Sequence, residues 1–103
     1  MKCQKLVRDL IPQLIEDDGD EAVVRVLDQD EYYEALREKL QEEVTEYLES
    51  EDPDELADIV EVVRTLVNFH SMSVTDLELT RQKKLAEHGG FEERLFLEEI
   101  IEN

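Results

Sequence analysis

The chain has 103 residues, of which 41% are hydrophobic and 39% are charged, so its length and composition favour a single globular domain. It carries 29 acidic and 11 basic side chains, which give a formal net charge of −18 at pH 7. This excess of acids argues against a nucleic-acid-binding protein, because such proteins contact phosphates through a basic face. Unscreened charges of one sign repel each other, so the sequence indicates a halophilic protein or one that holds cations.

The sequence also lacks the patterns of membrane and secreted proteins. No run of residues reaches the roughly 18 apolar positions that a membrane span requires, and segment 1–9 carries charges where a signal peptide is apolar. We therefore expect a cytoplasmic protein that does not contact membranes. The lone cysteine, Cys3, excludes an intrachain disulfide and a cysteine zinc cluster.

The first predicted element is a short helix over 6–16. Its apolar residues recur at helical spacing, Asp9 can cap its N-terminus, Pro12 suits its first turn and Gly19 follows its end. The valine-rich stretch 21–27 is too short for a helix, so it predicts a short strand or an extended arm.

Two long amphipathic helices are predicted next, over 30–50 and 53–70. Their apolar residues recur three and four positions apart. Asp52 can cap the later helix, and Glu55, three residues further on, can complete a capping box. Because the connection at 51–53 is so short, we expect the two helices to lie antiparallel and side by side.

A fourth helix is predicted between a cap at Ser73 or Thr75 and the glycine pair 89–90. The tail 91–101 alternates only in part, so its pattern fits either a strand or a helix, with a short strand or an arm as the alternatives near 91–97. Four helices on short connections predict an all-α, four-helix-type bundle that forms one domain over 1–103.

Acidic side chains border the predicted core of the two long helices. At about 100° per residue, Glu43 and Glu46 lie on one flank of the earlier apolar stripe, with Glu42 nearer to solvent. Glu55 and Asp58 border the stripe of the later helix. In an antiparallel helix pair, two residues that lie at the same height have sequence numbers that add up to the same total. This rule places Glu43 opposite Asp58. The same rule places Glu46 opposite Glu55, in a layer about 4.5 Å away.

Carboxylates that converge in this way require a compensating charge. Each desolvated carboxylate costs several kcal/mol and repels its neighbours. A divalent cation compensates them, and ligands that are all oxygen suit Mg²⁺ or Mn²⁺. The alternative is a chance meeting in a chain with 29 acids, with Glu55 in a capping box and with Glu43 and Glu46 solvated.

The same residues carry a resemblance to a known family. Segments 43–46 (EVTE) and 55–58 (ELAD) have the form E-x-x-E followed by E-x-x-D. This pair resembles the signature of the MazG-like, all-α nucleotide pyrophosphohydrolase superfamily. Segments 5–12 (KLVRDLIP) and 88–91 (HGGF) are similar to a small single-domain branch of it, the house-cleaning or phosphoribosyl-ATP pyrophosphohydrolase-like proteins.

The resemblance implies a Mg²⁺-dependent hydrolase that converts a nucleoside triphosphate, canonical or modified, to the monophosphate and pyrophosphate. It also implies a homo-oligomer, a dimer or a tetramer, because family members generally complete the nucleotide pocket with a partner subunit. The residues that match the family's metal ligands are Glu43, Glu46, Glu55 and Asp58. The general base that activates water is expected among Glu42, Glu43 and Glu46.

A polyphosphate substrate also requires cations, which are scarce in so acidic a chain. The candidates are Lys5 and Arg8 in the N-terminal block and Arg81, Lys83 and Lys84 in the fourth helix. The alternative for the fourth-helix bases is that they pair with acids of their own helix.

Two other functions remain open at this point. The first is the phosphoribosyl-ATP pyrophosphohydrolase of histidine biosynthesis, which a panel of substrates distinguishes. The second is a non-catalytic helical interaction module whose acids only keep it dissolved in salt.

Overall fold

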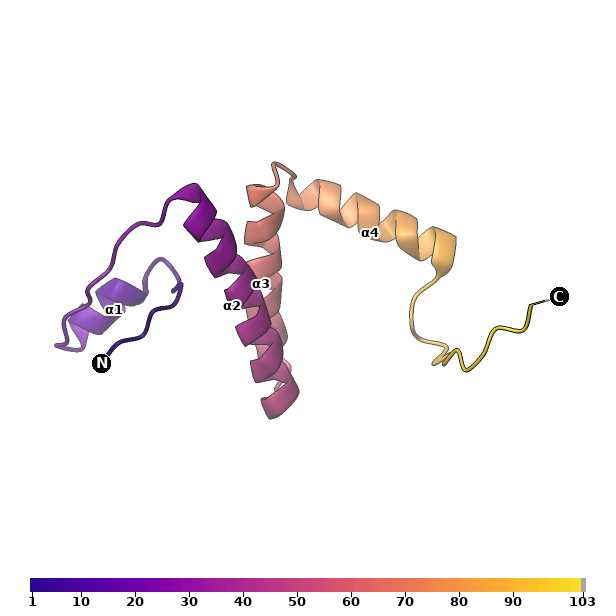
Figure 1. The fold of residues 1–103 in the computed structure, drawn as a ribbon, viewed down its shortest axis with the longest axis horizontal. Coiled ribbons are helices and arrows are strands. Elements are labelled where there is room, and N and C mark those ends of the chain that lie inside the picture. The colour runs from indigo at the N-terminus through magenta and orange to yellow at the C-terminus, as the bar shows by residue number, and fades with distance from the viewer. Residues whose placement is uncertain (103) are drawn as a thin grey trace.

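The computed structural model describes residues 1–102. It contains four helices: α1 (Ile11–Asp17), α2 (Gln29–Ser50), α3 (Asp54–Phe69) and α4 (Val74–His88). No strand occurs among these residues, so the chain is all-α, as the sequence predicts. Figure 1 shows α2 and α3 side by side and antiparallel, with α1 on one side of this hairpin and α4 projecting from the other.

The core is a narrow seam between α2 and α3. Leu36 of α2 is 2% exposed, and Val62 and Val67 of α3 are each 8% exposed. Where α2 begins and α3 ends, the Tyr33 ring stacks on the Phe69 ring with their centroids 4.9 Å apart. Burial of one such side chain stabilises the fold by roughly 1.5–3 kcal/mol, so this seam fixes how the two helices face each other.

Capping boxes explain where α2 and α4 begin. The Asp28 carboxylate accepts a hydrogen bond from the Glu31 backbone N–H at 2.9 Å, and the Glu31 carboxylate accepts one from the Asp28 N–H at 3.3 Å. Ser73 and Asp76 form the same reciprocal pair at α4, with both distances 3.0 Å. The predicted cap at Ser73 and the predicted helix end at Gly89 are therefore confirmed.

The first helix is shorter than the sequence predicts. It covers Ile11–Asp17, and the residue that precedes it is Leu10, which provides no side-chain cap, so the predicted cap at Asp9 is wrong. The physical reason is Pro12, which has no N–H to donate to the Arg8 carbonyl, so the helical hydrogen-bond pattern cannot continue towards residue 6. The helix therefore begins at Ile11, with the proline in its first turn.

The two uncertain stretches contain neither a helix nor a strand. Segment 21–27 is an extended arm, which was one of the two predicted outcomes. Segment 91–97 forms neither a strand nor a helix, which leaves the predicted arm: it makes a turn at its start, and Arg94 has a left-handed φ of 60°. A strand is stable only when it pairs with another, and neither stretch has such a partner among residues 1–102.

The turn between α2 and α3 leaves Glu55 out of a capping box. The Asp52 carboxylate accepts a hydrogen bond from the Asp54 N–H at 2.9 Å. The Asp52 N–H donates instead to the Ser50 hydroxyl oxygen at 3.1 Å, so the alternative in which Glu55 completes a capping box does not occur. Glu51, with a left-handed φ of 57°, reverses the chain. Glu55 therefore keeps its carboxylate available to face α2.

The described chain is elongated, with extents of 66 × 32 × 22 Å and a radius of gyration of 18.6 Å. A compact chain of this length has a radius of gyration of about 13 Å. Within residues 1–102, α2 packs closely on α3, α3 meets α4 near their junction, and α1 packs on no other helix. None of these helices combines the length and the apolar character that a transmembrane span requires.

Candidate metal centre

A cavity of about 320 Å³ lies between the α2–α3 hairpin and the N-terminal segment. Its lining residues are Lys5, Val7, Arg8, Ile11, Lys39, Glu43, Glu46, Glu55 and Asp58. The hairpin brings all four acids of the EVTE and ELAD segments to one surface, together with both bases of the N-terminal block.

Glu43 is the most enclosed of these acids. It lies on the side of α2 that faces α3, and only 7% of the residue is exposed. Its Oε1 atom is 3.4 Å from Lys39 Nζ, one helical turn earlier, while its Oε2 atom is buried without a hydrogen-bond partner. A buried carboxylate oxygen without a partner carries a full desolvation penalty, so this position is suited to a cation.

The other carboxylates of the cavity lie close to Glu43. Glu43, Glu55 and Asp58 each place one oxygen within 4.8 Å of the others. Glu42, Glu43 and Glu46 form a second such group, in which Glu42 is half-buried and Glu46 is exposed. Glu43 belongs to both groups and so lies at their centre.

The protonation of two of these acids reflects their crowding. Burial raises the pKa of Glu43, and the nearby Glu46 charge raises this pKa further, although Lys39 opposes both effects. Burial also raises the pKa of Glu55, with further contributions from the charges of Glu46 and Asp58. The metal-free site thus holds protons more strongly than solvated carboxylates do, and a divalent cation would relieve the same repulsion.

The donor set is chemically selective. Every atom that the two groups offer is a carboxylate oxygen. Hard cations such as Mg²⁺ and Mn²⁺ prefer such ligands, whereas softer metals favour thiolate or imidazole. The residues present therefore fit Mg²⁺ or Mn²⁺.

Cations of the chain partly neutralise this cluster. Arg8 Nη2 lies 2.6 Å from Asp58 Oδ1, and Lys5 lines the same cavity. Lys39, which the sequence analysis did not single out, lies 3.4 Å from both Glu42 Oε2 and Glu43 Oε1. Its position four residues before Glu43 on the same helical flank was the signal that could have identified it.

The basic residues predicted on α4 lie away from this cavity. Arg81, Lys83 and Lys84 are not among its lining residues, and α4 extends away from the hairpin (Figure 1). Arg81 pairs with Glu78 at 2.6 Å, and Lys83 approaches Glu87 at 4.0 Å. For Arg81 and Lys83 the structure shows the alternative, which is pairing with acids of the same helix.

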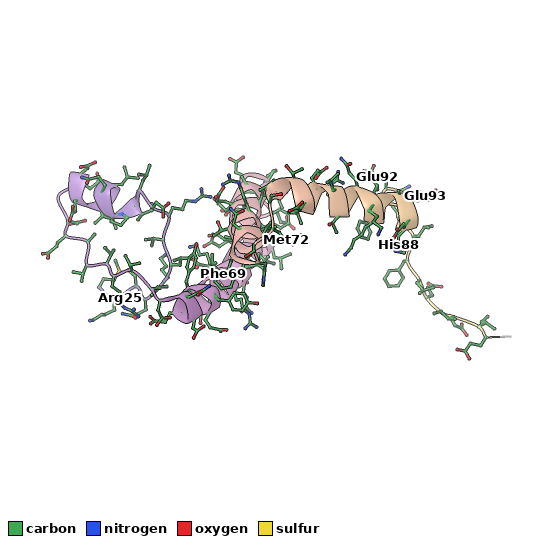
Figure 2. The ribbon with its side chains drawn as sticks, turned by 90° about the horizontal axis from the view of Figure 1, so that it is seen from above. Arg25, Phe69, Met72, His88, Glu92 and Glu93 are labelled. Atoms are coloured by element: carbon green, nitrogen blue, oxygen red, sulfur yellow. The ribbon has the colours of Figure 1, made fainter. Side chains whose placement is uncertain are left out.

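The HGGF segment is also remote from the acids in its own chain. Figure 2, a view from above, shows His88 with Glu92 and Glu93 at the far end of α4, away from Phe69 at the end of α3. A smaller cavity of about 240 Å³ lies there and includes Gly89 among its lining residues. The cluster on the α2–α3 hairpin is thus built without α4 or the segment that follows it.

Comparison with known proteins finds a partial relative. Over 42 residues the chain is 55% identical to an uncharacterized protein of Mycolicibacterium smegmatis. This match covers 41% of the chain and 43% of the relative, so it spans less than half of the relative's length. No family model matches the chain. No solved structure matches it either.

Proposed function

We propose that the protein is a Mg²⁺-dependent nucleotide pyrophosphohydrolase that acts in the cytoplasm on nucleoside triphosphates, canonical or modified. The observation that carries this proposal is the buried Glu43 carboxylate, whose Oε2 has no partner, at the centre of a cluster with Glu55 and Asp58. Such an oxygen-only cluster supports a hard divalent cation. The resemblance of segments 43–46 and 55–58 to the MazG-like signature supports the reaction, in which water cleaves the bond between the α- and β-phosphates.

The residues of the cavity and of the acidic cluster have different roles in the proposed reaction. Glu43, Glu55 and Asp58 would hold Mg²⁺, which would supply positive charge to neutralise the polyphosphate and to favour ionisation of the attacking water. Glu42 and Glu46 lie beside this group, where a carboxylate can accept a proton from the attacking water. Lys5 and Arg8, on the opposite wall of the cavity, bind phosphate oxygens through charge-assisted hydrogen bonds.

We further propose that the protein works as a homo-oligomer, a dimer or a tetramer. The described chain has an accessible surface of 9612 Å², whereas a compact monomer of 12.1 kDa exposes about 6,000 Å². The excess of about 3,600 Å² per chain is larger than the roughly 1,000–2,500 Å² that each partner buries in an obligate dimer. Apolar side chains contribute to it: Leu48 is 68% exposed and Val60 is 63% exposed on the hairpin itself.

The test of the catalytic proposal is pyrophosphate release from a panel of nucleotides with Mg²⁺ or Mn²⁺ in high salt. We expect metal-dependent, saturable turnover, and we expect Glu43→Gln and Asp58→Asn to abolish it. Glu49→Gln is the matched control, because Glu49 is an exposed acid of the same helix outside the cavity.

The panel also separates the alternatives. Turnover confined to phosphoribosyl-ATP would assign the protein to the histidine-pathway reaction instead. An absence of release from every substrate, together with an absence of saturable Mg²⁺ binding in calorimetry, would leave a non-catalytic acidic module.

A further inference from the structure

We propose that Arg8 is an exchangeable counter-ion. In the metal-free protein it pairs with Asp58. When a divalent cation binds Asp58, the Arg8 guanidinium pairs with a phosphate of the substrate instead. One side chain would thereby couple metal loading to phosphate binding. This inference rests on the proposed function, because it assigns a role to a residue of the same cavity.

The pair between Arg8 and Asp58 differs from the other ion pairs of the described chain. Its partners are 50 residues apart, with Nη2 and Oδ1 at 2.6 Å. Every other ion pair in residues 1–102 joins residues no more than six positions apart, as between Arg25 and Glu31. The Arg8 contact thus links the N-terminal segment to the acidic cluster, and local helix geometry does not explain it.

Arg8 occupies a ligand of the candidate metal. Asp58 is one of the residues whose oxygens converge with those of Glu43 and Glu55. A guanidinium hydrogen-bonded to Asp58 therefore competes with a divalent cation for that carboxylate. This contact is weakly held, because 57% of the Arg8 side chain and 40% of the Asp58 side chain are exposed, and exposed ion pairs contribute little.

Lys39 provides the internal comparison. Its side chain is 17% exposed and its Nζ lies 3.4 Å from an oxygen of Glu42 and an oxygen of Glu43. A base so enclosed by α2 is a fixed counter-ion of the cluster. Arg8, on a segment that precedes α1, is the base that can leave without disturbing the hairpin.

Arg8 remains within the cavity after it leaves Asp58. Val7 and Ile11, on either side of it in the sequence, both line the cavity, as does Lys5. The displaced guanidinium thus no longer pairs with a carboxylate but stays beside the metal site. Its planar fork of donors matches two phosphate oxygens at once, which an ammonium group does not.

The net charge of the site changes in the same step. Together with Glu42 of the acidic cluster, the cavity has three basic and five acidic side chains, which leaves two net negative charges. One divalent cation would cancel them. The metal-free site therefore repels a polyphosphate and the loaded site does not, and by linkage a bound polyphosphate must tighten the metal by the same factor.

The experiment measures two binding equilibria in high monovalent salt, with Mn²⁺ followed by electron paramagnetic resonance and with tripolyphosphate added to the Mn²⁺-loaded protein in calorimetry. We expect Arg8→Gln to bind Mn²⁺ about two- to fivefold more tightly than the wild type, because a competitor is lost. We expect the same variant to bind tripolyphosphate about ten- to a hundredfold more weakly, because a charge-assisted bidentate contact is lost.

Matched variants separate this role from general charge effects. Lys5→Gln removes the same charge from the same cavity without a contact to Asp58, so in high salt its Mn²⁺ affinity should change less than that of Arg8→Gln. Arg64→Gln, an exposed arginine of α3 outside the cavity, should change neither equilibrium. Arg8→Lys should restore competition with Mn²⁺ but only part of the tripolyphosphate affinity.

The outcomes distinguish the two proposals. Wild-type protein without a saturable Mn²⁺ site would overturn the proposed metal centre itself. A saturable site whose Mn²⁺ affinity is unchanged or reduced in Arg8→Gln would overturn the exchange and leave the metal centre intact. Tighter Mn²⁺ binding with unchanged tripolyphosphate binding would also overturn it, because Arg8 would then compete without passing to the phosphate.

Discussion

Glu43 is the residue where stability and the proposed metal binding conflict. Its carboxylate is 7% exposed, one oxygen has no partner, and its neighbours in the cluster are also acidic. A glutamine at this position keeps the shape and removes the charge. We expect Glu43→Gln to stabilise the metal-free protein by about 1 kcal/mol, and so to raise its Tm by about 4–8 °C.

Thermal unfolding with and without Mg²⁺ measures this effect. Mg²⁺ should raise the Tm of the wild type but not that of Glu43→Gln. The control Glu49→Gln should stay within about 0.5 kcal/mol of the wild type in both conditions. A Glu43→Gln variant that is less stable than the wild type without metal would show that the buried charge is already compensated within the chain.

The raised pKa values of Glu43 and Glu55 predict how the stability of the metal-free protein depends on pH. Above the ordinary carboxyl pKa of 4.5, the folded state holds protons that the unfolded state has released. The free energy of unfolding therefore decreases as the pH rises through this window. Because the proposed Mg²⁺ would require ionised ligands, we expect any stabilisation by Mg²⁺ to increase with pH over the same window.

Urea unfolding at a series of pH values, with and without Mg²⁺, tests this dependence. The fall in stability should be smaller in Glu43→Gln, because one of the two shifted groups is removed. Glu31 acts in the opposite direction, since Arg25 and the Asp28 backbone lower its pKa to about 2. The stability that ionised Glu31 contributes is lost as the pH falls below the ordinary pKa of a glutamate. An equal slope in the wild type and Glu43→Gln would contradict the prediction.

At the scale of the elements, the hairpin was the most predictable part. The three- and four-residue spacing of apolar side chains specified α2 and α3, and the short turn required them to be antiparallel. These two facts suffice to place Glu43 near Asp58, because the rise per residue is the same in both helices. The geometry of the acidic cluster is thus encoded locally.

Other features could not be predicted because they depend on contacts beyond local sequence. The direction of α4 relative to the hairpin is set by a few contacts near its start, so the helical pattern of Arg81 and Lys84 did not reveal that they lie far from the acids. The arm at 21–27 and the segment at 91–97 have apolar residues at strand-like spacing, yet neither finds a strand to pair with among residues 1–102.

The cap of α4 provides a test of how independent that helix is. Ser73→Ala removes the acceptor for the Asp76 N–H, and we expect it to destabilise the protein by about 1 kcal/mol. Because α4 does not line the acidic cavity, the affinity for Mn²⁺ should not change. Circular dichroism and Mn²⁺ titration measure the two effects, and a loss of Mn²⁺ affinity would show that α4 supports the site.

At the scale of the whole molecule, the exposed apolar surface is the dominant feature. Leu48 and Val60 on the hairpin, and Phe91 and Phe96 beyond α4, are each more than 60% exposed. None of them lines the acidic cavity, so association through these side chains leaves the site open. The net charge of −18 opposes association, and salt screens that repulsion.

We therefore expect light scattering in high salt to give a mass at least twice the 12.1 kDa of one chain. The unfolding midpoint should rise with protein concentration, as it does for subunits that stabilise one another. Leu48→Glu should shift the mass towards the monomer, whereas Glu49→Gln should not. A monomeric mass for the wild type, with a midpoint independent of concentration, would contradict the proposed oligomer.

The location of the acidic cluster on a single hairpin also has a consequence for how the protein folds. Contacts between residues close in the sequence form early, because they require only a short loop to close. The α2–α3 hairpin brings Glu43 near Asp58 without any contribution from α4. A divalent ion bound at that early stage would offset the repulsion among the carboxylates, so the proposed ligand of the finished site would also assist its folding.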